Sequence, residues 1–117
     1  MVWTLSQIAL GGAAGSVLRY LTITSVGAPW GTALVNVAGS FVMGLLFVAL
    51  SGRPYLSPLL LAGVLGGFTT FSAFSLDALK LWQGGQIVSA FAYVAGSVIL
   101  SLAAVALGAA LAKGALG

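Results

Sequence analysis

Residues 57–82, SPLLLAGVLGGFTTFSAFSLDALKLW, form an apolar stretch long enough to cross a membrane as a helix. The centre of this stretch, GGFTTFSAFS at residues 66–75, carries two glycines, two threonines and two serines. Glycine weakens a helix, and hydroxyl side chains satisfy backbone groups locally. A helix broken at membrane depth is tolerated only where its backbone is buried in protein or lines a cavity. The stretch therefore predicts either a helix broken at mid-membrane or ordinary helix–helix packing.

The whole chain has the composition of a membrane protein. Of its 117 residues, 61% are hydrophobic and 4% are charged, and the mean hydropathy is +1.19. Soluble domains carry about 25% charged residues. The sequence therefore predicts an all-α membrane protein with four transmembrane helices in a single domain, residues 1–117. The four apolar stretches cover residues 2–22, 29–50, 57–81 and 86–112.

Few residue types that carry enzyme chemistry are present. The chain has no cysteine and no histidine, and Asp77 is its only acidic residue. Thiolate and imidazole metal sites, paired-carboxylate catalysis within one chain and a Ser/His/Asp triad are therefore excluded. The four basic residues are scattered and form no nucleic-acid patch. The chain is predicted not to be an enzyme and to have no nucleic-acid partner, with the lipid bilayer as its surroundings.

The basic residues are balanced across the membrane. Four spans would put Arg53 and Lys113 on one side and Arg19 and Lys80 on the other. Orientation follows the excess of positive charge on the cytoplasmic side, and here neither side has an excess. One interpretation is chance in a chain with few charges. The other is insertion in both orientations, which would allow pairing as an antiparallel dual-topology homodimer with a two-fold axis in the membrane plane.

Polar residues recur at a spacing of four within two of the predicted spans, which places each set on one helix face. The sets are Thr32, Asn36 and Ser40 in the second span, and Tyr93, Ser97 and Ser101 in the fourth. Serine and threonine in membrane helices often bond only to their own backbone or to a neighbouring helix. The amide of Asn36 is costlier to bury, so it needs partners in a buried network or a wet path. Two aligned sets favour a polar track over isolated helix contacts.

The motifs GTALVNVAGSF at residues 31–41 and GGFTTFSAFS at residues 66–75 resemble those of the Fluc (CrcB) fluoride ion channel family. The resemblance covers nearly the whole chain and includes GGAAGSVLRY at residues 11–20. It implies a fluoride-selective channel of the cell inner (plasma) membrane, multi-pass, that exports fluoride passively and protects the cell from fluoride toxicity. It also implies an antiparallel homodimer with two pores and a structural sodium ion at the dimer axis. The sequence departs from the family at Ala73, where threonine is common, and at Asp77, where glutamate is usual.

The resemblance also implies roles for particular residues. The implied pore and fluoride residues are Asn36, Phe71, Phe74, Thr32, Ser72, Ser75, Tyr93, Ser97 and Ser101. The backbone carbonyls of Gly66 and Thr69, from both subunits, are implied as sodium ligands. A helix break near residues 66–70 would leave carbonyl oxygens unpaired in the membrane core, and a bound cation would relieve that cost. No carboxylate is near in the sequence, which disfavours a divalent ion.

Neutral hydrogen-bond donors suit the conduction of fluoride, a small anion that holds its water tightly. Conduction needs binding strong enough to replace hydration and weak enough to release the ion. Asn36 supplies two N–H groups, each hydroxyl supplies one O–H, and phenylalanine ring edges add weak positive potential. Arg19, near a span end, would raise the anion concentration at a vestibule by electrostatic focusing, or would serve as a simple interfacial anchor.

Two other functions are compatible with the size of the chain. A small proton-coupled multidrug transporter has the same span count and dual topology, but it needs a membrane carboxylate, and Asp77 lies toward the end of its span. A non-transporting membrane assembly protein would use the small residues only for helix contacts. A proton exchanger would respond to a pH gradient and lose function with Asp77→Asn, whereas an assembly protein would pass no ion.

Overall fold

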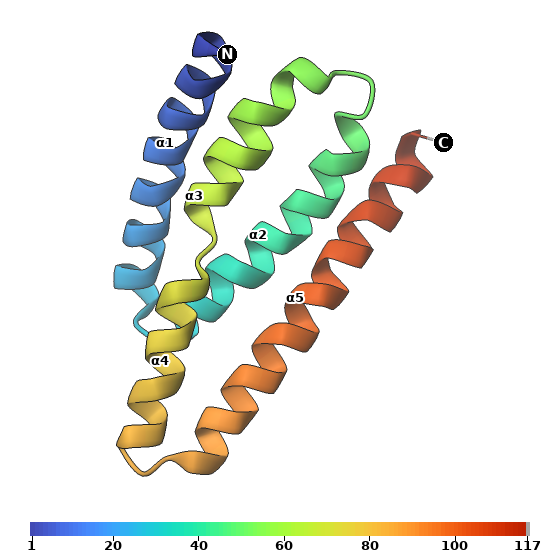
Figure 1. Ribbon diagram of the computed structural model, residues 1–117. Helices are drawn as coiled ribbons and strands as arrows, with labels where there is room; N and C mark the ends of the chain where they lie inside the picture. The colour runs from blue at the N-terminus through green and yellow to red at the C-terminus, as the bar shows by residue number, and fades with distance from the viewer. Residues whose placement is uncertain (117) are drawn as a thin grey trace.

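The computed structural model describes residues 1–116 as helices joined by short turns (Figure 1). In chain order these are α1 (Val2–Val26), α2 (Trp30–Ala49), the short turn η1 (Pro54–Leu56), the π-helical η2 (Pro58–Leu65), α3 (Gly66–Phe68), α4 (Phe71–Gln83) and α5 (Ile87–Leu116). Both termini and the connection from α2 to η1 lie at one end of the molecule, and the connection from α4 to α5 lies at the other (Figure 1). The predicted all-α class is confirmed.

Three segments of the described chain are long and apolar enough to cross a membrane: Trp30–Ala49, Pro54–Gln83 and Ile87–Ala115. Helix α1 has 25 residues but is not among them. It is less apolar because Gln7, Arg19 and several glycines and hydroxyl residues interrupt its hydrophobic side chains. By length and composition, the structure therefore has three candidate spans where the sequence pattern predicted four.

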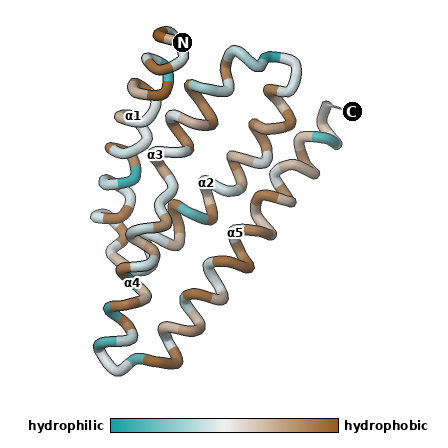
Figure 2. Tube along the Cα trace, in the orientation of Figure 1, coloured by the Kyte–Doolittle hydropathy of each residue, from teal (hydrophilic) through white to brown (hydrophobic). Residues whose placement is uncertain are grey.

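Most positions along the helices are apolar, and hydrophilic positions are few and dispersed along the trace (Figure 2). Large exposed apolar residues on the three longest helices include Leu10, Val17, Phe47, Ile99 and Leu102. Within the described residues, the largest side chains to be fully buried are Val35 and Thr32. An apolar surface of this extent marks contact with a membrane or with another protein.

Glycines bring α2 and α5 into backbone contact. A side chain at Gly44 would collide with the carbonyl of Val105 on α5, and one at Gly108 would collide with the carbonyl of Phe41 on α2. Such reciprocal small-residue contacts let membrane helices approach closely. The contact lies one helical turn beyond Ser40. It therefore sets the spacing between α2 and α5 next to the polar positions of both helices.

Helix α1 packs against η2 and α3 through a second set of glycines. Side chains at Gly11 and Gly15 would collide with backbone atoms of η2. From the opposite side, a Cβ at Gly67 would come within 2.6 Å of the carbonyl oxygen of Gly12. The segment that precedes α4 is therefore held flush against α1, with backbone touching backbone.

The helical path is interrupted at two residues between α3 and α4. Thr69 (φ −85°, ψ 155°) and Thr70 (φ −151°, ψ 121°) are extended. Gly66 and Gly67 remain helical, so the glycines are not themselves the interruption. Thr70 begins α4 as its N-cap, and its Oγ1 accepts a hydrogen bond from the N–H of Ala73 at 3.1 Å.

Candidate functional site

A cleft of about 360 Å³ opens between α2, α5 and the interruption that precedes α4. Its lining combines one amide, five hydroxyl and two phenylalanine side chains with two aliphatic ones. The lining residues that matter for its chemistry are Asn36, Ser40, Thr69, Thr70, Phe71, Phe74, Ser97 and Ser101, and Val98 and Leu102 complete it. No charged side chain lines the cleft. Its polarity therefore comes from neutral donors and acceptors alone.

Asn36 holds the interruption through two hydrogen bonds to one residue. Its Nδ2 donates to the carbonyl oxygen of Thr70 (2.9 Å), and its Oδ1 accepts from the N–H of Thr70 (2.8 Å). Both backbone groups of an extended residue are thereby satisfied, as a buried segment outside a helix requires. The amide nitrogen carries two N–H groups, and one of them is used in this way. The other remains to serve the cleft.

The carbonyl groups around the interruption are unequally satisfied. The carbonyl of Leu65 accepts from both the N–H and the Oγ1 of Thr69, each at 3.0 Å. The carbonyl of Gly67 accepts from Nη1 of Arg19 at 3.1 Å. Among the described residues, the carbonyl of Thr69 has no hydrogen-bond donor, and no side chain donates to the carbonyl of Gly66. These two oxygens are the ones that the family resemblance implies as sodium ligands.

The two phenylalanines of α4 meet edge to face at the mouth of the cleft. The ring centroids of Phe71 and Phe74 lie 5.5 Å apart at an angle of 66°, and Phe74 lies 5.3 Å from the ring of Tyr93. Phe74 is buried, with 8% of its surface exposed, whereas Phe71 is 77% exposed. Ring edges carry positive potential. Phe71 is therefore open to anything that contacts the chain from outside, including a second subunit.

The hydroxyl groups of this region fall into two kinds. Within the described residues, Ser40, Ser97 and Ser101 line the cleft and make no side-chain hydrogen bond, so their O–H groups are free to donate into it. Ser75 instead donates to the carbonyl of Phe71 at 2.9 Å, and Ser72 lies 3.3 Å from the hydroxyl of Thr70. Ser72 and Ser75 are exposed and lie outside the cleft lining.

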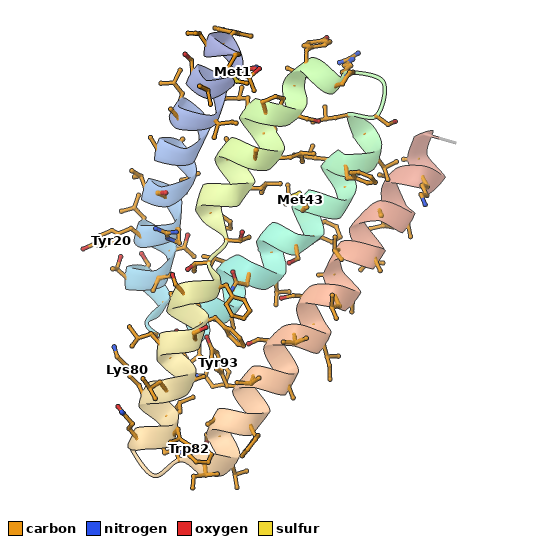
Figure 3. All side chains as sticks on the ribbon, viewed as in Figure 1. Met1, Tyr20, Met43, Lys80, Trp82 and Tyr93 are labelled. Carbon is orange, nitrogen blue, oxygen red and sulfur yellow. The ribbon has the colours of Figure 1, made fainter. Side chains whose placement is uncertain are left out.

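The remaining predicted pore residues lie deeper in the protein or at another cavity. Thr32 is 1% exposed. Tyr93 lies between α4 and α5 (Figure 3), and its hydroxyl donates to Oδ2 of Asp77 at 3.3 Å. Tyr93 lines a second cavity of about 270 Å³ together with Trp30 and Gln86. The predicted residues therefore divide between two cavities instead of forming one continuous lining within a single subunit.

A cation site in this protein would use oxygen ligands from the backbone or from hydroxyl groups. Among the described residues, no three His, Cys, Asp or Glu side chains gather to form a metal site. The backbone carbonyls of Gly66 and Thr69 are hard oxygen ligands without charge, which suits a monovalent ion better than a divalent one.

Two polar lining residues were not among the predicted site residues. Ser40 lies one turn beyond Asn36 on the same face of α2, and that spacing was the signal for it. Thr70 reaches the cleft because it is extended, and its signal was its place beside Thr69 within the polar run. Both fit the uncharged hydroxyl character of the cleft.

Apolar helical spans around an uncharged polar cleft define a multi-pass integral membrane protein. Residues 6–109 match the family described as CrcB-like protein, Camphor Resistance (CrcB). The chain therefore belongs to the CrcB-like family, and the resemblance predicted from its motifs is confirmed.

Relatives match over almost their full length. The fluoride-specific ion channel FluC of Paracoccus denitrificans is 51% identical over 121 residues, which cover 97% of this chain and 98% of the relative. FluC of Cereibacter sphaeroides is 52% identical over 124 residues with the same coverage, and FluC of Hahella chejuensis is 48% identical over 119 residues, covering 93% and 94%. These relatives are named as ion channels and not as enzymes.

Proposed function

We propose that this protein is a fluoride-selective ion channel. The observation that carries the proposal is the cleft of Asn36, Phe71, Ser97 and Ser101, whose donors are neutral and whose hydroxyls are free. The names of the relatives, fluoride-specific ion channels, point the same way. Neutral donors offer fluoride a partial replacement for its hydration shell, and the absence of a fixed charge in the lining lets the ion leave again.

The proposed transport is passive, so the direction follows the fluoride gradient. A cell that accumulates fluoride would export it through this path and escape its toxicity. The proposed location is the cell inner (plasma) membrane, where a single domain of residues 1–117 spans the bilayer four times. Helix α1 is the fourth span, because its 25 residues exceed the roughly 20 needed. In this arrangement the interruption at Thr69 and Thr70 lies near the middle of the membrane.

The proposed assembly is an antiparallel dual-topology homodimer with two pores. Phe71 supports it, because a ring that is 77% exposed next to the cleft is available to complete a pore in contact with a second subunit. The small difference in basic residues supports it too: Arg53 and Lys113 lie at one end and Lys80 at the other, while Arg19 is bonded beside the interruption, so neither orientation is strongly favoured. The division of Ser97 and Tyr93 between two cavities fits a path that is completed only between subunits.

The proposed cofactor is a structural sodium ion at the dimer axis. The carbonyls of Gly66 and Thr69 from each subunit would hold it; within the described chain the carbonyl of Thr69 is without a donor, and that of Gly66 accepts from no side chain. A bound cation would offset the cost of leaving these carbonyls unpaired in the membrane core. Neutral oxygen ligands fit a monovalent ion.

One alternative function involves Asp77. A proton-coupled multidrug transporter needs a membrane carboxylate that exchanges protons. Asp77 is buried on α4 and accepts a hydrogen bond from Tyr93, so it is the one group that such a transporter would use. The Asp77→Asn variant separates the two functions, because a proton exchanger loses pH-driven transport while a fluoride channel still conducts.

The deciding experiment measures ion efflux from liposomes that contain the purified protein, first with a fluoride electrode and then with a chloride electrode. Rapid fluoride loss without chloride loss is expected. Well-folded protein that releases no fluoride would refute the channel, and it would leave a non-transporting assembly protein as the better description.

A further inference from the structure

Arg19 is brought to the interruption by the packing of α1. The glycine contacts at Gly11 and Gly15 fix α1 against η2 and α3, backbone to backbone. Arg19 follows Gly15 by four residues, so it lies one turn further along the same face. The packing of α1 at Gly11 and Gly15 therefore fixes the position of the Arg19 guanidinium relative to α3.

The guanidinium of Arg19 donates a hydrogen bond to one of the last backbone carbonyls before the interruption. Nη1 of Arg19 donates to the carbonyl oxygen of Gly67 at 3.1 Å, and the side chain is half-buried. Gly67 lies within the last turn before the helical path stops at Thr69. The final carbonyls of a helix have no partner within it, and they form its negative end. A charged donor is a strong partner for such a carbonyl.

The interruption is held from two sides. On one side, Asn36 of α2 bonds to both backbone groups of Thr70. On the other side, Arg19 of α1 bonds to Gly67, three residues earlier. Between these two contacts lie only Phe68 and Thr69. Two anchors this close leave the short segment little freedom to rotate.

We infer that Arg19 is a positioning residue, which holds the carbonyl of Gly67 toward α1 and thereby fixes the backbone of the interruption and the place of Phe71. The inference goes beyond the proposed vestibule and anchoring roles of Arg19, and its transport readout rests on the proposed fluoride channel. In this role the geometry of the hydrogen bond matters, whereas in electrostatic focusing only the charge matters. With the carbonyl of Gly67 occupied, the carbonyl of Thr69 is still without a donor among the described residues.

Ionic strength separates the two roles. A focusing charge acts through solvent and is screened by salt, with a screening length of about 30 Å at 0.01 M and about 3 Å at 1 M. A half-buried hydrogen bond is screened much less. The transport defect of a positioning variant should therefore be the same at low and high salt, whereas a focusing defect should disappear at high salt.

The test compares Arg19→Met, Arg19→Lys and the control Arg53→Met. Methionine removes both the charge and the donor, lysine keeps the charge and one donor, and Arg53 lies exposed before η1 with no side-chain hydrogen bond among the described residues. Fluoride efflux should fall about tenfold or more in Arg19→Met at every salt concentration, with a lower preference for fluoride over chloride, because a charged hydrogen bond is lost. Arg19→Lys should restore only part of the rate, because an ammonium keeps the charge but not the donor geometry of the guanidinium, and Arg53→Met should resemble the wild type.

A second readout does not depend on transport. In the purified wild-type and variant proteins, amide hydrogen exchange is measured over residues 66–75. Arg19→Met should speed exchange in this segment by about tenfold or more, since local opening becomes easier, while α5 stays unchanged. Unchanged exchange in Arg19→Met, or a defect that vanishes at high salt, would overturn the inference. If the wild type releases no fluoride, the proposed function fails, and the exchange result alone decides the role of Arg19.

Discussion

Asn36 shows how one side chain serves both the backbone and the cleft. Its amide satisfies the N–H and the C=O of Thr70, at 2.8 and 2.9 Å, and this leaves one N–H, which the proposed channel would offer to an ion. A longer or shorter side chain at this position could not reach both groups of the same extended residue. The amide therefore does more than offer donors to an anion, because it also fixes the wall on which Phe71 and Phe74 lie.

Asn36→Ala should impair both the fold and the transport. It leaves two backbone groups of Thr70 without partners, at a cost of about 1–3 kcal/mol for each buried group. Fluoride efflux should fall by at least about tenfold if the path needs this geometry. Asn36→Asp is the matched control: it still accepts from the N–H of Thr70, so its stability should fall less, but its charge should still block an anion. Wild-type efflux in Asn36→Ala would contradict this role.

The serine hydroxyls offer a sharper comparison. Ser97 and Ser101 line the cleft without a side-chain hydrogen bond in the described chain, whereas Ser75 donates to Phe71. Ser97→Ala together with Ser101→Ala should slow fluoride efflux by about tenfold, since each removes a donor worth about 0.5–1.5 kcal/mol. Ser75→Ala should stay within about threefold of the wild type, because its proton is already used. If the double variant and Ser75→Ala lose equal amounts of fluoride efflux in the same liposome assay, the free hydroxyls of the cleft do not contribute more than the bonded hydroxyl of Ser75.

At the scale of elements, the interruption between α3 and α4 illustrates what a sequence pattern can and cannot provide. The polar run at residues 66–70 marked the region, but the pattern assigned the weakness to its glycines. In the structure Gly66 and Gly67 stay helical, and Gly67 is there because α1 approaches too closely for a side chain. Thr69 and Thr70 leave the helix instead, since Asn36 of another helix satisfies the backbone there. Such a partner is a tertiary contact, which local sequence does not encode.

Composition alone predicted the all-α membrane class, because the apolar content of a chain can be read without knowing which elements contact one another. The number of spans was harder to predict from the sequence. Arg19 and Gln7 lower the mean hydropathy of α1, while its length still suits a membrane span. Asn36, Ser97 and Ser101 could be expected at a common cleft from their spacing on helix faces. Tyr93 belongs to the same set by spacing but lies at the second cavity. Spacing fixes a helix face, whereas the position along the cleft depends on how the helices cross.

The contact between α2 and α5 gives a prediction at the same scale. Gly108→Leu places a side chain against the carbonyl of Phe41 and should push the helices apart, costing about 1–3 kcal/mol. The control is Gly114→Leu on the same helix, where nothing lies within 4 Å. Thermal unfolding in detergent, followed by circular dichroism, should show a lower Tm for Gly108→Leu only. A similar Tm for both variants would mean that the close contact does not matter for stability.

The whole molecule has basic residues at both ends, and the ends differ by one, since Arg19 is hydrogen-bonded beside the interruption instead of lying at an end. Arg53 and Lys113 belong to the end that holds the termini, and Lys80 lies near the opposite end, at the close of α4 (Figure 3). Because orientation in a membrane is set by differences in such counts, the protein carries little instruction about which end faces the cytoplasm. The proposed antiparallel dimer requires that both orientations occur in one membrane.

Cysteine labelling tests the two orientations directly, since the chain has no cysteine of its own. Gly52→Cys lies in the connection before η1, and nothing comes within 4 Å of a side chain there. A membrane-impermeant thiol reagent should label part of the population from outside the cell and the rest only after lysis. Gln86→Cys, at the opposite end, should behave in the same way. Complete labelling of one variant and none of the other would refute dual topology.

The reciprocal glycine contact of α2 and α5 also bears on biosynthesis. Ribosomes deliver α2 early and α5 last, so the face of α2 that carries Asn36 and Gly44 has no partner until the end of translation. One whole wall of the cleft, with Ser97 and Ser101, arrives with that final helix. A chain that ends before α5 therefore lacks this wall of the cleft and the partner that fits against Gly44.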